Sequence, residues 1–231
     1  MKLNIIDSII SLFYPRVCAA CGRPLFNFEQ RVCLKCQTLL QKTGYEMNEE
    51  NPLAKLFYGR VRLHAVTACF FFSKEGRVQH LIHELKYKGN TDAGYYLGQE
   101  IGKSIKEAPL FQDIDYLIPV PLHPKKERKR GYNQSYIIAL GIRDKTGIAI
   151  GKDFLLRSVN TATQTHKSKE ERWQNVKDIF EVHDAEQLVG KHVLLIDDVL
   201  TTGATLESCA LALSQIPDIT ISCATAACAG N

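Results

Sequence analysis

Apolar positions along the chain follow two patterns that together indicate an α/β fold. Four apolar or β-branched runs have the length of a strand, at residues 64–72, 116–120, 193–196 and 219–224. Two segments repeat apolar residues at helical spacing, one through Val78, Leu81, Ile82 and Leu85 and one through Leu206, Cys209, Ala210 and Leu213. A further helix is expected over residues 134–144. Strands that alternate with helices predict a domain with a mostly parallel central sheet.

The first residues combine an apolar face with polar interruptions. Their apolar positions predict a short amphipathic helix through Ile5, Ile6, Ile9, Ile10 and Phe13. Asp7 and Ser8 interrupt the run, and Pro15 and Arg16 follow before any small-residue cleavage site, so we do not expect a signal peptide. The apolar stretches are also far shorter than the roughly 18 residues of a membrane helix. We therefore expect a cytoplasmic protein without membrane insertion.

Four of the eight cysteines form two closely spaced pairs, Cys18 with Cys21 and Cys33 with Cys36. Each C-x2-C pair brings two thiolates onto one tight turn, and two such pairs supply the four sulfurs of a tetrahedral zinc site. An iron–sulfur centre uses the same ligands and stays open as an alternative. With no histidine, carboxylate or open position, the metal would hold a small fold together and would not catalyse.

The cysteine pairs divide the chain into two predicted domains. An N-terminal helix and a four-cysteine zinc ribbon are expected over residues 1–50, and the α/β domain over residues 51–231, with the polar stretch 45–55 as linker. The remaining cysteines lie among apolar neighbours and are expected to be buried small hydrophobic residues. They are Cys69, Cys209, Cys223 and Cys228.

Composition and charge narrow the class of function. The chain of 231 residues is 45% hydrophobic and 23% charged, which excludes disordered and fibrous proteins. Its 29 bases exceed its 25 acids by four. Residues 125–130, KKERKR, hold five bases and one acid and so account for the whole excess. A protein that coats DNA over its whole surface would not show this distribution, which favours a focused anion site.

The most informative segment is VLLIDDVLTTGAT at residues 193–205. Four apolar residues form a predicted strand that ends in Asp197 and Asp198, and a Thr/Gly-rich turn then opens a helix. Ligands of open α/β sheets bind outside the carboxyl ends of strands. Backbone N–H groups at the helix N-terminus, threonine hydroxyls and a permissive glycine make a phosphate cradle. The adjacent acids would repel phosphate and suit sugar hydroxyls or Mg²⁺, so the segment predicts a phosphorylated ribose as ligand.

These thirteen residues resemble the motif by which type I phosphoribosyltransferases bind phosphoribosyl pyrophosphate (PRPP). Further motifs are LKYKG at residues 85–89, IPVPLHPKKERKRGYNQ at residues 118–134, and a segment over residues 157–180 with Arg157, Thr163, Gln164, Arg172, Asn175 and Phe180. With a zinc ribbon in front, they are similar to the ComF family of competence-associated proteins over nearly the whole chain. The resemblance implies a type I phosphoribosyltransferase-like domain, a role in DNA uptake during natural transformation, and a ComF-associated DNA helicase as partner.

The resemblance also implies roles for single residues. Asp197 and Asp198 would contact the ribose 2′- and 3′-hydroxyls. The 5′-phosphate would be wrapped by the turn that follows, at Thr201, Thr202, Gly203, Ala204 and Thr205. A pyrophosphate loop, with Mg²⁺ accompanying the ligand, would contain Lys125, Lys126, Arg128, Arg130 and Gly131. The same bases also suit the backbone of single-stranded DNA. Lys86 and Lys88 are interpreted as surface helix residues.

Three functions remain open at this point. The chain is a phosphoribosyltransferase with an unidentified acceptor, a protein that handles single-stranded DNA, or a non-catalytic PRPP sensor. Thr201 stands where 6-oxopurine phosphoribosyltransferases have an aspartate base, and threonine cannot take a proton at neutral pH. This departure weakens an interpretation as a hypoxanthine or guanine salvage enzyme. The polar residues 158–172 predict either a lid over the ligand or an ordinary surface loop.

Overall fold

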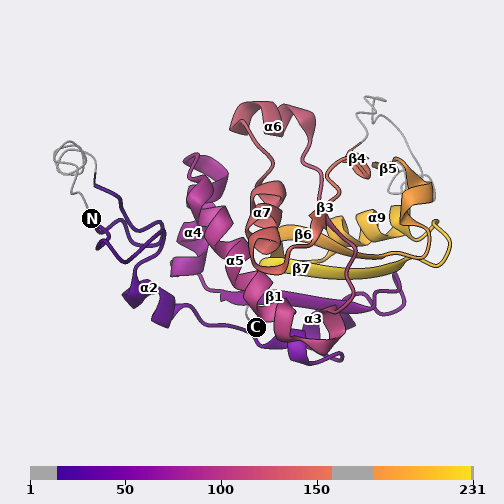
Figure 1. Cartoon of the computed structure of the whole chain (residues 1–231), viewed down its shortest axis with the longest axis horizontal. Coiled ribbons are helices and arrows are strands. Elements are labelled where there is room, and N and C mark those ends of the chain that lie inside the picture. Colours follow the sequence, from indigo (N-terminus) through magenta and orange to yellow (C-terminus); the bar gives the residue numbers. More distant parts are fainter. Residues whose placement is uncertain (1–14, 158–178, 230–231) are drawn as a thin grey trace.

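The structure is a computed structural model that describes residues 15–157 and 179–229 (Figure 1). The predicted N-terminal helix and the polar segment 158–172 lie outside the described residues. At the centre is a five-stranded sheet in the order β1-β7-β6-β2-β3, and each neighbouring pair is parallel. The strands are β1 Ala65–Phe72, β2 Tyr116–Pro119, β3 Ala149–Ile150, β6 His192–Leu200 and β7 Thr220–Ala229. The predicted parallel central sheet is therefore confirmed.

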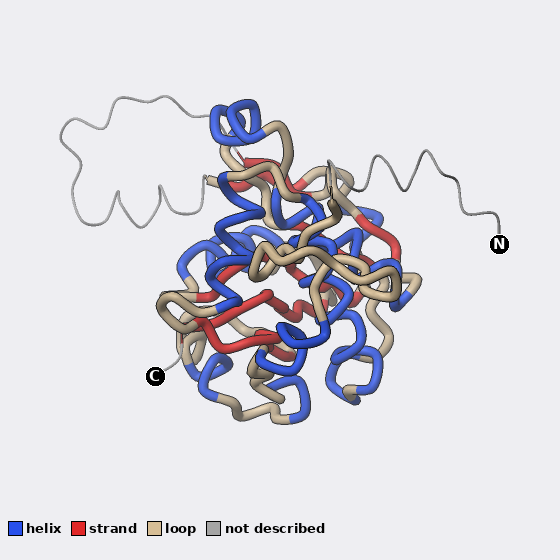
Figure 2. The backbone as a smooth tube through the Cα atoms, turned by 90° about the vertical axis from the view of Figure 1, so that its left-hand side faces the viewer, coloured by secondary structure: helices blue, strands red, loops and turns tan. Residues whose placement is uncertain are grey.

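Helices pack on both faces of this sheet, and Figure 2 shows the strands in the interior with helices around them. One apolar core lies under the helices α4 Arg77–Tyr87, α5 Thr91–Glu107 and α7 Gln134–Thr146. The other lies under α3 Pro52–Lys55 and α9 Ala204–Leu213. All four periodic residues of α4 are buried, as their spacing predicts. No helix in the described part of the chain is both long and apolar enough to cross a bilayer.

The remaining elements are short. A two-stranded antiparallel ribbon pairs β4 Leu155–Arg157 with β5 Phe180–Val182. The short helices outside the two main layers are α2 Leu34–Leu39 and α6 Pro124–Arg130. Three 3₁₀ turns complete the described structure, at Tyr45–Met47, Pro109–Phe111 and Ala185–Leu188. The four cysteines outside the two pairs are buried, which confirms their interpretation as small hydrophobic residues.

Strand β6 is longer than the apolar run that predicted it. It pairs with β7 as far as Leu200, which lies opposite Cys228, so Asp197 and Asp198 are inside the strand and not after its end. On its other side β2 stops at Pro119, opposite Ile196. The ladder to β7 therefore holds the two acids in extended backbone, while β2 does not pair with β6 beyond Ile196.

The chain order places a topological switch point at these acids. From β2 the chain runs through α7 to β3 at one side, whereas from β6 it runs through α9 to β7 at the other. The two connections thus leave in opposite directions from neighbouring strands. Ligands of open α/β sheets bind outside the carboxyl ends of the strands at such a point.

Residues 41–55 are packed along β1. The backbone N–H of Thr43 donates to the carbonyl of Cys69 at 3.1 Å, and Phe71 N–H donates to the carbonyl of Gln41 at 3.1 Å. Asn51 is 1% exposed and its side chain donates to the carbonyl of Val66 at 2.8 Å. The stretch expected to be a linker is thus tied to the sheet by hydrogen bonds. The domain boundary between residues 50 and 51 stays a prediction.

Candidate ligand site and metal centre

The acid pair of β6 forms a hydrogen-bonded group with the start of α7. The Ser135 hydroxyl donates to Oδ1 of Asp197 at 3.0 Å, and the backbone N–H of Asp198 donates to the same oxygen at 2.8 Å. Burial, together with the negative charge of Asp198, raises the pKa of Asp197 to about 7. At neutral pH the pair therefore carries less than its full two negative charges.

Lys86, at the end of α4, reaches the second acid. Its Nζ lies 2.8 Å from Oδ1 of Asp198, and the lysine side chain is 25% exposed. Asp198 itself is only 4% exposed, and its Oδ2 has no hydrogen-bond partner within residues 15–157 and 179–229. Sequence reasoning took Lys86 for an ordinary surface residue. The helical periodicity that located α4 says nothing about what this side chain meets on β6.

The predicted phosphate turn lies between β6 and α9. Thr201, Thr202, Ala204 and Thr205 are exposed, whereas Gly203 is buried, has φ +78° and is the N-cap of α9. The backbone N–H of Ala204 approaches the Thr202 hydroxyl at 3.5 Å. The turn thus follows the acid pair directly and carries exposed threonines at the N-terminus of a helix, while its binding of a phosphate stays a prediction.

The segment after α3, with Phe57 and Arg60, packs against this turn. A Cβ added at Gly203 would lie 2.9 Å from Cζ of Phe57, a side chain that is 1% exposed. Arg60 donates to the carbonyl of Thr202 at 3.3 Å and also pairs with Glu207 of α9. Phe57 and Arg60 lie about 140 residues before the turn, so sequence reasoning did not connect them with it. Residues 58–63 also line a pocket of about 480 Å³.

The basic run 125–130 is a helix, α6, and not the loop we predicted (Figure 1). Pro124 occupies its first turn, the His123 ring accepts a hydrogen bond from the N–H of Lys125 at 3.2 Å, and Gly131 ends it with φ +87°. These capping residues explain why a highly charged sequence forms a helix here. Its basic last turn also suits the negative end of the helix dipole.

The side chains of the predicted pyrophosphate group are largely exposed. Lys125, Lys126 and Arg128 lie on the surface of α6, Arg130 contacts the side chain of Gln134, and Gly131 follows the helix. The structure therefore places these residues on a helix that stands above α7 in Figure 1. Their contact with a ligand stays a prediction.

The residues after α6 connect three elements around the acid pair. The hydroxyl of Tyr132 donates to the carbonyl of Leu85 at the end of α4. Asn133 donates to the carbonyl of Val120, just after β2, at 2.9 Å. Ser135 then reaches Asp197 of β6. Residues 132–135 thus connect the ends of α4 and β2 with the acid pair inside β6, a role that no local pattern indicates.

The four predicted metal ligands come together near the N-terminus. The Sγ atoms of Cys18, Cys21, Cys33 and Cys36 all lie within 4.8 Å of one another, and none of the four forms a disulfide. Backbone N–H groups of Ala20 and Cys33 point at Sγ of Cys18, at 3.4 and 3.3 Å. This donor set fits a tetrahedral thiolate-bound metal such as zinc. Bound there, the metal would cross-link the two turns.

The cysteine module is attached to the α/β domain. Arg31 pairs with Asp92 of α5 at 2.8 Å, and its guanidinium lies over the ring of Tyr95 at 4.4 Å from the centroid. Buried residues of the module, among them Cys33 and Cys36, are continuous with the core under α4 and α5. Folding of the module and the position of these helices are therefore coupled by packing.

Phosphoribosyltransferases are among the solved structures that match part of the chain, while no protein-family model matches it. A glutamine PRPP amidotransferase from B. subtilis is 19% identical over 62% of this chain and 30% of that one, with a TM-score of 0.44. Adenine phosphoribosyltransferase from Leishmania tarentolae is 13% identical over 79% and 77% of the two chains, with a TM-score of 0.37. Because these TM-scores are below 0.5, the fold class rests on the sheet topology. That topology confirms the predicted α/β domain with a mostly parallel central sheet, preceded by a four-cysteine module.

Curated sequence relatives of this chain are named for competence and for DNA utilization. Competence protein F of Haemophilus influenzae is 32% identical over 59% of this chain and 61% of its own length. DNA utilization protein YhgH of Salmonella typhimurium is 30% identical over 54% and 56%, and competence protein ComFC of Bacillus subtilis is 34% identical over 43% and 38%. The chain thus matches less than two thirds of the length of these curated relatives. Two of these relatives carry the competence names of the ComF family that the sequence motifs resemble.

Proposed function

We propose that this protein binds PRPP, or a related ribose 5-phosphate ligand, together with Mg²⁺, as a phosphoribosyltransferase-like protein that serves DNA uptake. The observation that carries the proposal is the continuity of the site along β6 and α9. An acid pair, of which Asp198 is buried and Asp197 is half-buried, and a threonine-rich helix N-terminus follow each other within nine residues at the switch point of the sheet. We place this function in the cytoplasm, where the four cysteines of the metal site stay reduced.

The chemistry of the site fits the two ends of the ligand. Carboxylates accept hydrogen bonds from a vicinal diol, and Asp198 has an oxygen without a donor in the described structure. The turn at Thr201 and Thr202 offers N–H and hydroxyl donors to a phosphate. Mg²⁺ would accompany the pyrophosphate and neutralise part of its charge. Relatives named for competence favour DNA uptake as the process served.

Binding is tested by thermal unfolding with PRPP, with and without Mg²⁺. A ligand that binds only the folded state at 100 times its Kd stabilises that state by about 2.7 kcal/mol, so the melting temperature should rise by several degrees. We expect this rise with PRPP and Mg²⁺ and a smaller one without the metal. The same melting temperature with and without PRPP, at millimolar ligand, would refute the proposal.

Release of pyrophosphate distinguishes an enzyme from a sensor. A transferase displaces pyrophosphate from C1 of the ribose by a nitrogen nucleophile, and preorganised charge supplies most of the rate. Free pyrophosphate formed in the presence of candidate bases would establish transfer and identify the acceptor. Saturable PRPP binding without pyrophosphate release from any acceptor would favour the non-catalytic sensor.

A second candidate function is the handling of single-stranded DNA, and the surface of α6 favours it. Lys125, Lys126, Arg128 and Lys129 are all exposed within one short helix, so their charges face solvent together. Phosphate backbones bind such clusters largely through release of counterions. Relatives named DNA utilization protein fit this candidate as well. A DNA helicase would then be the natural partner for the same strand.

If this candidate function is right, the salt dependence of single-stranded DNA binding should come from the bases of α6. Changing its four exposed bases to alanine should weaken binding of a single-stranded oligothymidine and reduce the slope of log K against log salt by about 2 to 3, at roughly 0.7 per phosphate contact. Fluorescence anisotropy over a salt series measures this slope. The matched control removes the same charge from exposed lysines elsewhere, at Lys55, Lys74, Lys106 and Lys152. Equal losses in both variants would show that the DNA responds to net charge and not to α6.

A further inference from the structure

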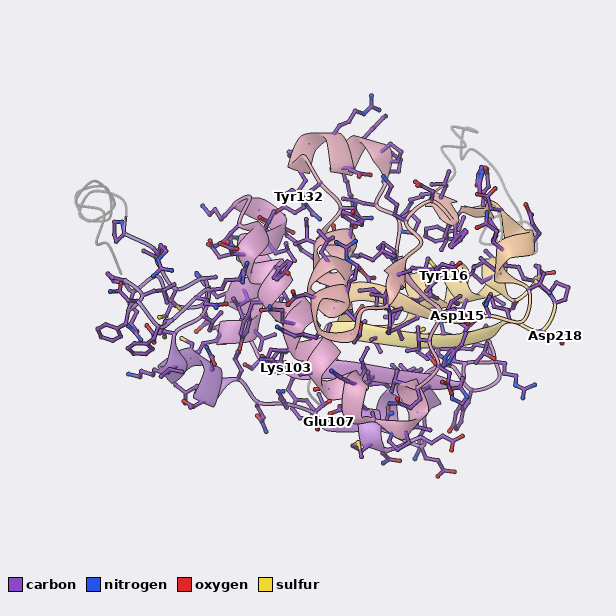
Figure 3. The ribbon with its side chains drawn as sticks, in the orientation of Figure 1. Lys103, Glu107, Asp115, Tyr116, Tyr132 and Asp218 are labelled. Carbon is purple, nitrogen blue, oxygen red and sulfur yellow. The ribbon has the colours of Figure 1, made fainter. Side chains whose placement is uncertain are left out.

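Lys86 contacts the acid pair, and the backbone is fixed in place both at the end of α4 and at Asp198 on β6. Its neighbour Leu85 is fully buried, and the Leu85 carbonyl accepts the hydrogen bond of Tyr132, the residue labelled near the end of α4 in Figure 3. Asp198 is fixed in turn by the ladder between β6 and β7. The side chain of Lys86 is thus the adjustable part of this contact. Its four-carbon stem and 25% exposure allow the ammonium to move without a shift of α4.

The contact leaves Asp198 only partly satisfied. An ionised carboxylate has about four acceptor positions, and a buried one that lacks donors is costly. Lys86 supplies one donor to Oδ1, while Oδ2 is buried and has no partner among the described residues. A vicinal diol supplies two hydroxyl donors and matches this deficit better than one ammonium does. The Lys86 ammonium therefore occupies a position from which the hydroxyls of a sugar would form more hydrogen bonds to Asp198.

We propose that Lys86 is a displaceable counter-ion of the ribose site and thereby a residue that selects for pyrophosphate. This inference rests on the proposed function. In the free protein the ammonium neutralises Asp198 at 2.8 Å. When ribose hydroxyls bind, they take its place on the carboxylate, and Lys86 turns to the anionic group attached at C1 of the ligand.

The consequence is a preference between two ligands that share the same ribose and 5′-phosphate. PRPP gives the displaced ammonium a new anionic partner, whereas ribose 5-phosphate leaves it without one. Binding of ribose 5-phosphate therefore breaks the Lys86–Asp198 ion pair without replacing it. Binding of PRPP replaces that pair with a contact between Lys86 and the pyrophosphate. Lys88, two residues further on, provides a natural comparison because it is exposed and belongs to the same LKYKG sequence.

Titration calorimetry with PRPP and with ribose 5-phosphate, both with Mg²⁺, tests this preference. We expect Lys86→Met to weaken PRPP at least tenfold and to leave ribose 5-phosphate unchanged or bound more tightly, because the variant has no ion pair to lose, so that the ratio of the two affinities collapses. Lys86→Arg should restore most of the ratio because it keeps the charge. Lys88→Met should leave both affinities within twofold of the wild type. Equal weakening of both ligands by Lys86→Met would mean that the lysine only supports the fold, and would overturn the inference.

A second measurement needs no ligand. Thermal unfolding of Lys86→Met, Asp198→Asn and the double variant forms a cycle in which the paired residues should show non-additive changes in melting temperature. Additive changes would overturn the ion pair itself. Failure of the proposed function has a different signature, because the wild type would then bind neither ligand. If the wild type binds neither ligand but Lys86 and Asp198 are still coupled in the thermal cycle, their ion pair is a structural contact only. Lys86 then has no role in ligand selection.

Discussion

Replacing Asp197 and Asp198 together with asparagine is expected to abolish the Mg²⁺-dependent stabilisation by PRPP while the fold stays intact. Each hydrogen bond to a charged group contributes about 1.5–3 kcal/mol, so loss of both carboxylates should raise the Kd by about two orders of magnitude or more. Asparagine keeps the size of each side chain and the extended backbone of β6. Thermal unfolding and calorimetry on the double variant measure stability and affinity separately.

The control for this variant is Asp153→Asn, an exposed aspartate between β3 and β4 that should leave PRPP binding unchanged. The melting temperature of the ligand-free double variant should stay within a few degrees of the wild type. The double variant loses the ion pair between Lys86 and Asp198. It also no longer places two neighbouring negative charges in a partly buried site, which is unfavourable in the wild type. A double variant that binds PRPP as tightly as the wild type would show that the ribose lies elsewhere.

Because of Asp197 and Asp198, we also expect the affinity for PRPP to depend on pH. The folded protein raises the pKa of Asp197 from 3.8 to about 7, first through burial and then through Asp198. A carboxyl whose pKa is raised binds its proton more tightly in the folded state, so its contribution to ligand-free stability falls as pH rises from about 4 to 7. A diol prefers the ionised acceptor. PRPP affinity should therefore rise with pH up to about 7 and then level off, a rise that Asp197→Asn removes.

Features encoded within one continuous segment were predictable from sequence. The apolar run of β6, the two acids and the Thr/Gly turn are contiguous, and the parallel sheet follows from alternating strands and helices. The two C-x2-C pairs likewise specify their own turns, and the four sulfurs meet as expected. In each case the physical cause is local, because backbone preference and short spacing decide the geometry.

The helices α5 and α6 were missed because their sequences carry misleading local signals. In α5 the glycines at 94, 98 and 102 weaken the helical pattern, yet they are required by packing. A Cβ at Gly98 would lie 2.0 Å from the carbonyl oxygen of Ile138, so glycine permits the close crossing of α5 and α7. In α6 a run of like charges indicates a loop, but Pro124 and Gly131 cap a helix around it.

The side chains that complete the candidate site come from distant parts of the chain. Lys86, Ser135 and Arg60 are brought to β6 and its turn by tertiary packing across separations of 62 to 142 residues. Their own segments show only that they lie on helices or in a polar turn. A single sequence has no signal for such contacts, because the partner of each residue depends on how the helices pack on the sheet.

Removal of the bound metal is expected to unfold the cysteine module and to leave the α/β domain folded. Metal binding to a four-thiolate site contributes an apparent 10–16 kcal/mol or so at neutral pH, which far exceeds what a module of this size gains from its own core. Cys21→Ser removes one of the four ligands at an exposed position. Elemental analysis should show about one zinc per wild-type chain and well below one per variant chain, and hydrogen exchange should lose protection in residues 18–36 of the variant.

The packing of the module defines how far this unfolding extends. Loss of the Arg31 contacts to Asp92 and Tyr95 frees the outer face of α5, but the buried α5 residues Leu97, Ile101 and Ile105 stay packed against α7 and the sheet. Protection should therefore fall in the module and persist in β6 and β7. Cys209→Ala is the matched control, because this buried cysteine lies outside the cluster and its loss should leave the zinc content at one. A chelated wild-type protein that keeps residues 18–36 protected would refute the structural role of the metal, and iron with visible absorption in place of zinc would identify an iron–sulfur centre.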